Sequence, residues 1–147
     1  MESARRAGRA FATDLHLYSK LRPCEPHRWK TEHVGHPCVH FDDVSAIPFV
    51  SNVAGVEEYQ HRARVRAGDR DTFVTVTPAV PGYESYCREL LRLGSPEHLI
   101  AEPAGSPSAV ASACLQKQTR AALIETAQNG GGLTIHPYMG IEEVWEL

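Results

Sequence analysis

The strongest constraint on the fold is an alternation of strand-like and helix-like segments that begins at Phe41. Three strand-like segments, TFVTVTP, HLIAEP and LTIHP, each end on a proline, and a glycine follows each one within a few residues. Strands that alternate with helices are typical of layered domains built on a mostly parallel sheet. The sequence therefore predicts an α/β domain over residues 41–147. Its sheet is expected to be open and mostly parallel, flanked by helices and preceded by an irregular extension over residues 1–40.

A further strand is expected at the start of this domain, in the segment VSAIPFVSN at residues 44–52. Pro48 favours an edge position for it, because proline cannot donate a hydrogen bond to a central ladder. Apolar residues spaced three and four positions apart predict helices over residues 53–67, 82–94 and 106–132.

Several side chains have expected places in these helices. Leu90 and Ile124 fall on the apolar stripes and are expected to be buried, and Ser106 is placed to cap the third long helix. The segment GIEEVWEL begins another helix. Its expected packing face consists of Ile141, Val144, Trp145 and Leu147. Trp145 is expected either to pack on the core or to dock a partner.

The carboxyl ends of the strands are the expected ligand site. In open parallel sheets these ends share one edge, where ligands collect. The polar residues that the strand ends and following corners place there are Asn52, Thr77, Glu102, Ser106, His136 and Tyr138. We expect these residues to bind a small-molecule or amino-acid-like substrate. The alternative is that the prolines and glycines only end strands and begin helices. Asp42 and Asp43 could pair as acid and base, but a solvated turn is the favoured interpretation.

Residues 1–40 concentrate possible metal ligands. They hold five of the eight histidines and two of the four cysteines. Cys24, His27, His36 and Cys38 are the candidates for a zinc site, although their spacing matches no standard finger. The alternative is a loop whose histidines are exposed or hydrogen-bonded. The four cysteines are scattered along the chain, which favours reduced thiols over a disulfide framework.

Charge and hydropathy exclude several classes of protein. The 147 residues carry a net charge of −3, which gives no general attraction to nucleic acid or to an anionic membrane. The four arginines of HRARVRAGDR are flanked by acidic residues, so a solvated helix is expected there. No apolar run reaches the roughly 20 residues of a membrane span, and no signal core follows the basic start. A cytoplasmic protein is expected.

Two glycine-rich segments do not fit nucleotide-binding motifs. NGGGLTIH precedes a strand and lacks a Lys-Ser/Thr pair, whereas a phosphate-binding loop follows a strand and opens a helix. AGSPS has the correct strand-to-helix order but lacks the spaced glycines of a dinucleotide fingerprint. A structural helix start is favoured.

Three segments carry a resemblance to a known family: IPFVSNVAGVEEYQHRARVR, TFVTVTPAVPGYESYCRELLRLGSPEHLIAEP and LTIHPYMGIEEVWEL. Together they resemble the leading, Rossmann-like domain of actinobacterial ATP-grasp ligases, the pre-ATP-grasp domain. Such ligases join a carboxylate to an amine through an acyl-phosphate made with ATP and magnesium. In them the leading domain packs under the ATP-binding lobes and supplies part of the substrate pocket from its strand ends.

The resemblance implies a substrate-side domain or truncated relative of an ATP-dependent carboxylate–amine ligase, inactive alone. It assigns no catalytic residue to this chain. The chain alone is expected to need no cofactor, and ATP and magnesium would bind when the missing lobes are supplied, for example by a partner protein. The alternative is a stand-alone binding module with a zinc-stabilised N-terminal arm.

Overall fold

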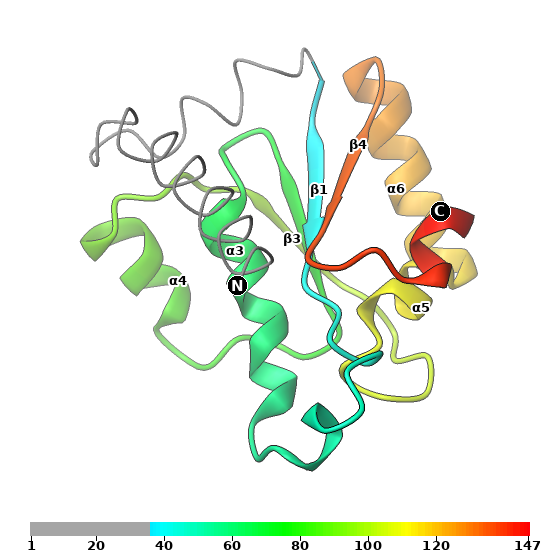
Figure 1. Ribbon diagram of the computed structural model, residues 1–147. Coiled ribbons are helices and arrows are strands. Elements are labelled where there is room, and N and C mark those ends of the chain that lie inside the picture. Colours follow the sequence, from blue (N-terminus) through cyan, green and yellow to red (C-terminus); the bar gives the residue numbers. More distant parts are fainter. Residues whose placement is uncertain (1–35) are drawn as a thin grey trace, which may run out of the picture.

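The computed structural model describes residues 36–147. In this range β1 (Cys38–Phe41), β2 (Thr72–Thr75), β3 (Glu97–Ile100) and β4 (Thr134–Pro137) form one sheet in the order β3-β2-β1-β4. All neighbouring strands run parallel. The predicted α/β architecture with an open parallel sheet is therefore confirmed (Figure 1).

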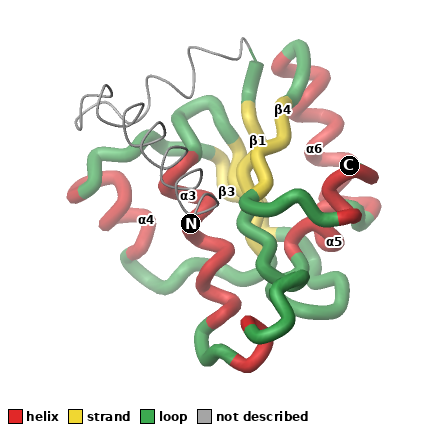
Figure 2. Tube along the Cα trace, in the orientation of Figure 1, coloured by secondary structure: helices red, strands yellow, loops and turns green. Residues whose placement is uncertain are grey.

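Helical segments cover both faces of this sheet (Figures 1 and 2). One face carries η2 (Val56–Arg62), α3 (Ala63–Arg66), α4 (Tyr83–Ser85) and the π-helical turn η3 (Tyr86–Leu90), with the short η1 (Val50–Asn52) before them. The other face carries α5 (Val110–Cys114), α6 (Lys117–Gly130) and the 3-10 turn η4 (Glu142–Glu146). No helix within residues 36–147 is long and apolar enough to cross a membrane.

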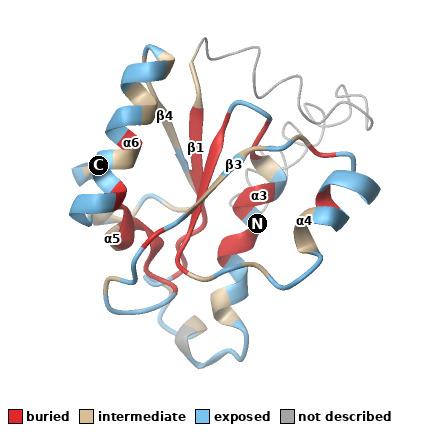
Figure 3. Ribbon diagram, turned by 180° about the vertical axis from the view of Figure 1, so that it is seen from behind, coloured by how far each residue is buried: buried red, intermediate tan, exposed pale blue. Residues whose placement is uncertain are grey.

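The main core lies between the sheet and the α5–α6 face. Val39 and Phe41 of β1 and Val74 of β2 are buried there against α5. Because strand side chains alternate between faces, Cys38, His40 and Phe73 point to the opposite, η2–α3 face. That face has a smaller apolar cluster of Phe73 with two alanines of the α3 region. Figure 3 shows the buried residues concentrated in the two central strands, β1 and β2, and in parts of α3 and α5.

The expected first strand is wrong. Residues 44–52 form turns and η1, and the strand is the preceding segment CVHF. The Asp43 carboxylate accepts a hydrogen bond from the Ser45 N–H at 2.8 Å, which turns the chain directly after β1. The edge position predicted from Pro48 is also wrong, because the first strand of the domain, β1, lies between β2 and β4.

Two residues expected on buried stripes are exposed. Leu90 is 73% exposed and Ile124 is 50% exposed, whereas their neighbours Cys87 and Leu123 are buried. The π-helical turn η3 departs from the 3.6-residue repeat on which the Leu90 prediction depended. In α6 the buried line runs through Thr119 and Leu123, four residues apart, and leaves Ile124 beside it.

The third predicted helix is divided, and Ser106 does not cap it. The chain breaks between α5 and α6 near Gln116, whose backbone is extended. Ser106 instead forms a turn, in which its carbonyl accepts the Ala109 N–H at 3.0 Å. Asp43, which follows β1, caps the first turn of α5 instead: its carboxylate accepts the Ala111 N–H at 2.8 Å.

The arginine-rich helix is not uniformly solvated. Arg64 is fully buried, and its guanidinium donates to Glu84 Oε1 at 2.7 Å and to the Gly94 carbonyl at 2.6 Å. Cys38, Cys87 and Cys114 are buried free thiols, as expected for these three residues. Cys24 lies outside the described residues.

Only one side of the C-terminal segment, residues 140–147, packs against the domain. Ile141, Val144 and Leu147 lie against the main core, as expected. Trp145 is 83% exposed, so it does not pack back on the domain. The segment is a single 3-10 turn over these residues.

Candidate functional site

The carboxyl edge of the sheet gathers the polar groups that best form a site. Asp42 and Asp43 follow β1, Thr77 follows β2, and Tyr138 follows β4. The helical segment η2 begins above this edge and contacts β1 and β2. Parallel strands direct their following loops to one edge, which explains why these residues come together.

Gln60 fixes the geometry of this edge. The buried carboxamide oxygen accepts hydrogen bonds from the backbone N–H groups of Val76 and Thr77. Its nitrogen donates to the Thr77 hydroxyl at 2.8 Å and to the Pro107 carbonyl at 3.4 Å. Gln60 therefore ties η2 to the end of β2 and to the loop before α5.

His61 lies next to this network. Its Nε2 is 3.4 Å from the Thr77 hydroxyl and 3.8 Å from Glu58 Oε2. The ring meets the rings of Tyr83 and His98 edge-on. Burial lowers the pKa of His61 from its ordinary value of 6.5, and the Glu58 carboxylate opposes that shift. At neutral pH the imidazole is therefore uncharged and can accept or donate one hydrogen bond.

A cavity of about 390 Å³ opens beside His61. Glu58, His61 and Arg62 line it from η2, and Val80 and Tyr83 line it from the segment after β2. The Tyr83 hydroxyl donates to the His61 carbonyl at 3.0 Å, which holds the two walls together. The cavity thus presents one anionic, one neutral and one cationic group from a single helical segment.

Arg62 is held between aromatic rings and a carboxylate. Its guanidinium lies 4.9 Å from the Tyr138 ring centroid and 5.4 Å from that of Tyr59. Its Nε is 3.8 Å from Asp42 Oδ2, and 51% of the side chain remains exposed. A cation held in this way keeps its position, and the exposed half of the Arg62 side chain is available to a ligand.

The expected solvated turn at Asp42 and Asp43 is wrong, because both residues are buried. Asp42 pairs with Arg66 as well as Arg62. Burial raises the pKa of the Asp42 carboxyl, and the two arginines oppose that shift. The Asp43 carboxylate accepts hydrogen bonds from the backbone N–H groups of Ser45 and Ala111. The carboxylates of Asp42 and Asp43 therefore have separate structural partners.

Comparison with models of protein families shows the family to which this chain belongs. A model described as the Pre ATP-grasp domain matches residues 60–147. The chain belongs to the pre-ATP-grasp family. No curated protein and no solved structure matches it. The matched range contains β2, β3 and β4 together with Gln60, His61 and Arg62, whereas β1 precedes it.

This pre-ATP-grasp domain places the six sequence-predicted site residues in different surroundings. Thr77 contacts Gln60 and His61, and Tyr138 contacts Arg62, so both adjoin the cavity over η2. Glu102 lines a separate cavity of about 550 Å³ beside Gln116 and Lys117. The remaining three residues are exposed: Asn52 in η1, Ser106 with its hydroxyl 2.9 Å from that of Ser108, and His136 within β4.

Sequence reasoning missed Gln60, His61 and Arg62 as site residues. They were assigned only to a helical stripe or to a solvated arginine-rich helix. Of these three residues only His61 could have been recognised from the sequence as a candidate site residue, because it is a histidine in a predicted helix that precedes a strand.

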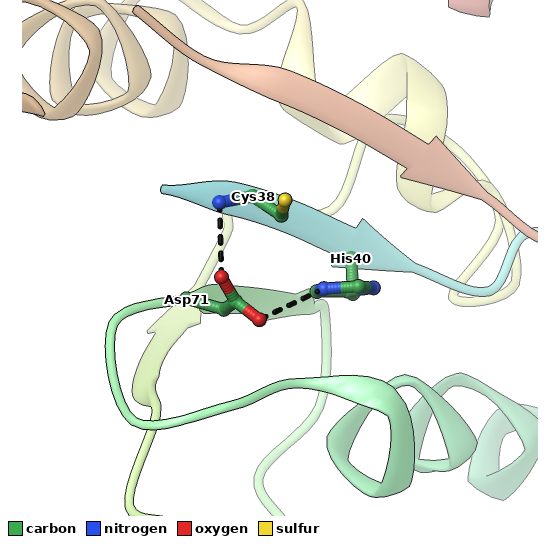
Figure 4. A group of neighbouring side chains, drawn as sticks. All are labelled: Cys38, His40 and Asp71. Atoms are coloured by element: carbon green, nitrogen blue, oxygen red, sulfur yellow. Dashed lines mark hydrogen bonds and ion pairs between the residues drawn. The ribbon is translucent and has the colours of Figure 1, made fainter. Parts of the chain in front are cut away.

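The metal candidates of the pre-ATP-grasp domain are also separated. Cys24 and His27 lie outside the described residues. His36 packs against Gly132, and its Nε2 is 3.4 Å from the Thr134 hydroxyl. Cys38 instead groups with His40 and Asp71 (Figure 4). Cys38 begins β1 and Asp71 precedes β2, so this group lies toward the amino ends of the strands.

Proposed function

We propose that this pre-ATP-grasp domain forms the substrate-binding side of an ATP-dependent carboxylate–amine ligase and is inactive alone. The family relationship supports the reaction class. The observation that carries the proposal is the cavity of about 390 Å³ at the carboxyl edge, with His61 and Arg62 in its wall. Substrates of α/β proteins bind at this edge because the strand ends and helix starts converge there.

The chemistry of the wall favours a small, amino-acid-like substrate. Arg62 offers a planar pair of donors to a carboxylate, and Glu58 offers an acceptor to an ammonium group. Neutral His61 stands between these two residues in sequence and can accept a hydrogen bond from the substrate. Asp42, Tyr59 and Tyr138 hold the Arg62 guanidinium and limit the entropy lost on binding.

ATP and magnesium belong to the other side of the proposed ligase. Two glycines at the end of α6 and just after it are used in packing: a Cβ on Gly130 would lie 2.5 Å from Pro37, and one on Gly132 would lie 2.6 Å from His36. We propose that the ATP-binding lobes come from a further polypeptide segment or a partner protein. Trp145, exposed on η4 while its neighbours pack on the core, is the proposed contact for those lobes.

The proposal can be tested by amide proton–nitrogen NMR of the complete chain. The protein is titrated separately with a panel of free amino acids and small carboxylates and with magnesium-ATP. We expect saturable shifts at His61, Arg62 and Thr77 with at least one member of the panel, and none with magnesium-ATP. Shifts confined to the Glu102 cavity would reject the η2 site. Saturable shifts with magnesium-ATP would show that the chain has a nucleotide site of its own. That result would reject the proposal that the chain is inactive because it lacks such a site.

A further inference from the structure

Three potential metal ligands lie together at the amino edge of the sheet. One donor atom from each of Cys38, His40 and Asp71 lies within 4.8 Å of the others. All three residues are buried, which distinguishes this group from the exposed acidic clusters that are common on protein surfaces. The Cys38 N–H and the His40 ring of β1 both reach the Asp71 carboxylate, which precedes β2 (Figure 4).

The parallel pairing of β1 and β2 produces this grouping. Cys38 and His40 are two residues apart on one strand, so they point to the same face. Val39 is the register partner of Thr72, which places Asp71 beside Cys38. The Cys38 N–H donates to Asp71 Oδ1 at 3.0 Å and confirms that placement. The positions of the three side chains are therefore set by backbone pairing.

The carboxylate and the imidazole are already oriented. Asp71 Oδ2 accepts the Gly68 N–H at 2.7 Å and lies 3.2 Å from His40 Nε2. These bonds leave lone pairs of the carboxylate available, since its two oxygens offer about four acceptor sites. The His40 ring stacks on that of His136 with 5.1 Å between centroids, which fixes its plane. Backbone donors and packing of this kind are what orient the ligands of metal sites in proteins.

We propose that Cys38 Sγ, His40 Nε2 and the Asp71 carboxylate bind a zinc-like divalent cation. Thiolate, imidazole and carboxylate together suit zinc, whereas magnesium and calcium take all-oxygen sites. Zinc ligands at bond lengths of about 2.0–2.3 Å lie roughly 3.3–3.8 Å apart, so the side chains close by on the order of 1 Å. The Cys38 thiol loses its proton to solvent on binding, and a water or another donor takes the fourth position.

This site is distinct from the cavity over η2 and does not depend on the proposed function. It joins the start of β1 to the loop before β2, so the bound ion would hold the amino edge of the two central strands. It also differs from a zinc site in residues 24–38, because it requires His40 and Asp71 and does not require Cys24 or His27.

The test uses Co²⁺ as a spectroscopic probe on the complete chain. The protein is treated with chelator, dialysed and titrated with Co²⁺, and thiolate-to-cobalt charge-transfer absorption is recorded before competition with Zn²⁺. We expect one equivalent of Co²⁺ to give this absorption and one equivalent of Zn²⁺ to remove it. Cys38→Ser should abolish the absorption. His40→Gln and Asp71→Asn should weaken Co²⁺ binding by at least about tenfold.

Matched controls separate this site from other thiols. Cys87→Ser and Cys114→Ser change buried cysteines outside the group and should keep the wild-type spectrum. Circular dichroism confirms that each variant is folded. If Asp71→Asn does not fold, Cys38→Ser and His40→Gln carry the test. The proposal is overturned if the wild-type chain gives no stoichiometric thiolate absorption, or if that absorption survives in folded Cys38→Ser.

Discussion

The Gln60 carboxamide nitrogen donates a hydrogen bond of 2.8 Å to the Thr77 hydroxyl, although the two residues belong to different layers of the domain. Gln60 lies in η2 and Thr77 lies just after β2. The same carboxamide accepts hydrogen bonds from the backbone of Val76 and Thr77. A single buried side chain thus connects the helical wall of the cavity with the strand end below it.

Replacing Gln60 with alanine should lower the free energy of unfolding by about 2–4 kcal/mol. The change leaves the buried Val76 N–H without its partner, and an unsatisfied buried polar group costs about 1–3 kcal/mol in addition to lost packing. Urea denaturation followed by circular dichroism measures the effect. Gln128→Ala, at an exposed position of α6, is the control and should change stability by less than about 0.5 kcal/mol. Equal effects of the two changes would show that the network does not stabilise the edge.

If the NMR titration finds an amino-acid-like ligand at the cavity, Arg62→Ala should weaken its binding by roughly 10- to 100-fold. A hydrogen bond to a charged group contributes about 1.5–3 kcal/mol, and alanine removes both donors of the guanidinium. Folding should be little affected, since half of the side chain is exposed. Arg88→Ala is the matched control, because Arg88 is also exposed and forms an ion pair with Glu89. Unchanged affinity in Arg62→Ala would remove Arg62 from the site.

Stability should fall as the pH drops below about 6.5, and His61 and His98 should carry part of that loss. Burial lowers the pKa of both histidines from 6.5 in the folded protein. Below 6.5 the unfolded chain therefore binds more protons than the folded chain, so their contribution is present above 6.5 and is lost during acidification. Urea midpoints between pH 5 and 8 measure the slope. His61→Gln should flatten it, and an unaltered slope in folded His61→Gln and His98→Gln would contradict this origin.

Adjacent residues of α6 should respond differently to truncation. Leu123→Ala should cost about 2–5 kcal/mol, because Leu123 is buried in the main core. Ile124→Ala should cost less than about 1 kcal/mol, since half of its surface is exposed. Thermal and urea unfolding of both variants make the comparison within one turn of one helix. A larger loss in Ile124→Ala would mean that its exposed side is covered in solution.

The sequence by itself determined the layered α/β architecture, three of the four strands and the edge at which their ends meet. These features follow from local patterns: β-branched runs, helical spacing, and proline or glycine at each corner. Two of the three segments that carried the family resemblance lie within residues 60–147, which the comparison assigns to the pre-ATP-grasp family. Local patterns also placed Ile141, Val144 and Leu147 on a packing face.

Only the tertiary structure decided the rest. CVHF is too short to show a period, and it becomes a central strand because β2 and β4 pair with it on both sides. Cys38 and Asp71 are 33 residues apart and meet through the register of that pairing. His61 and Arg62 form a cavity wall because Gln60 holds η2 on the end of β2. These relationships depend on contacts between distant segments, which no local spacing in the sequence specifies.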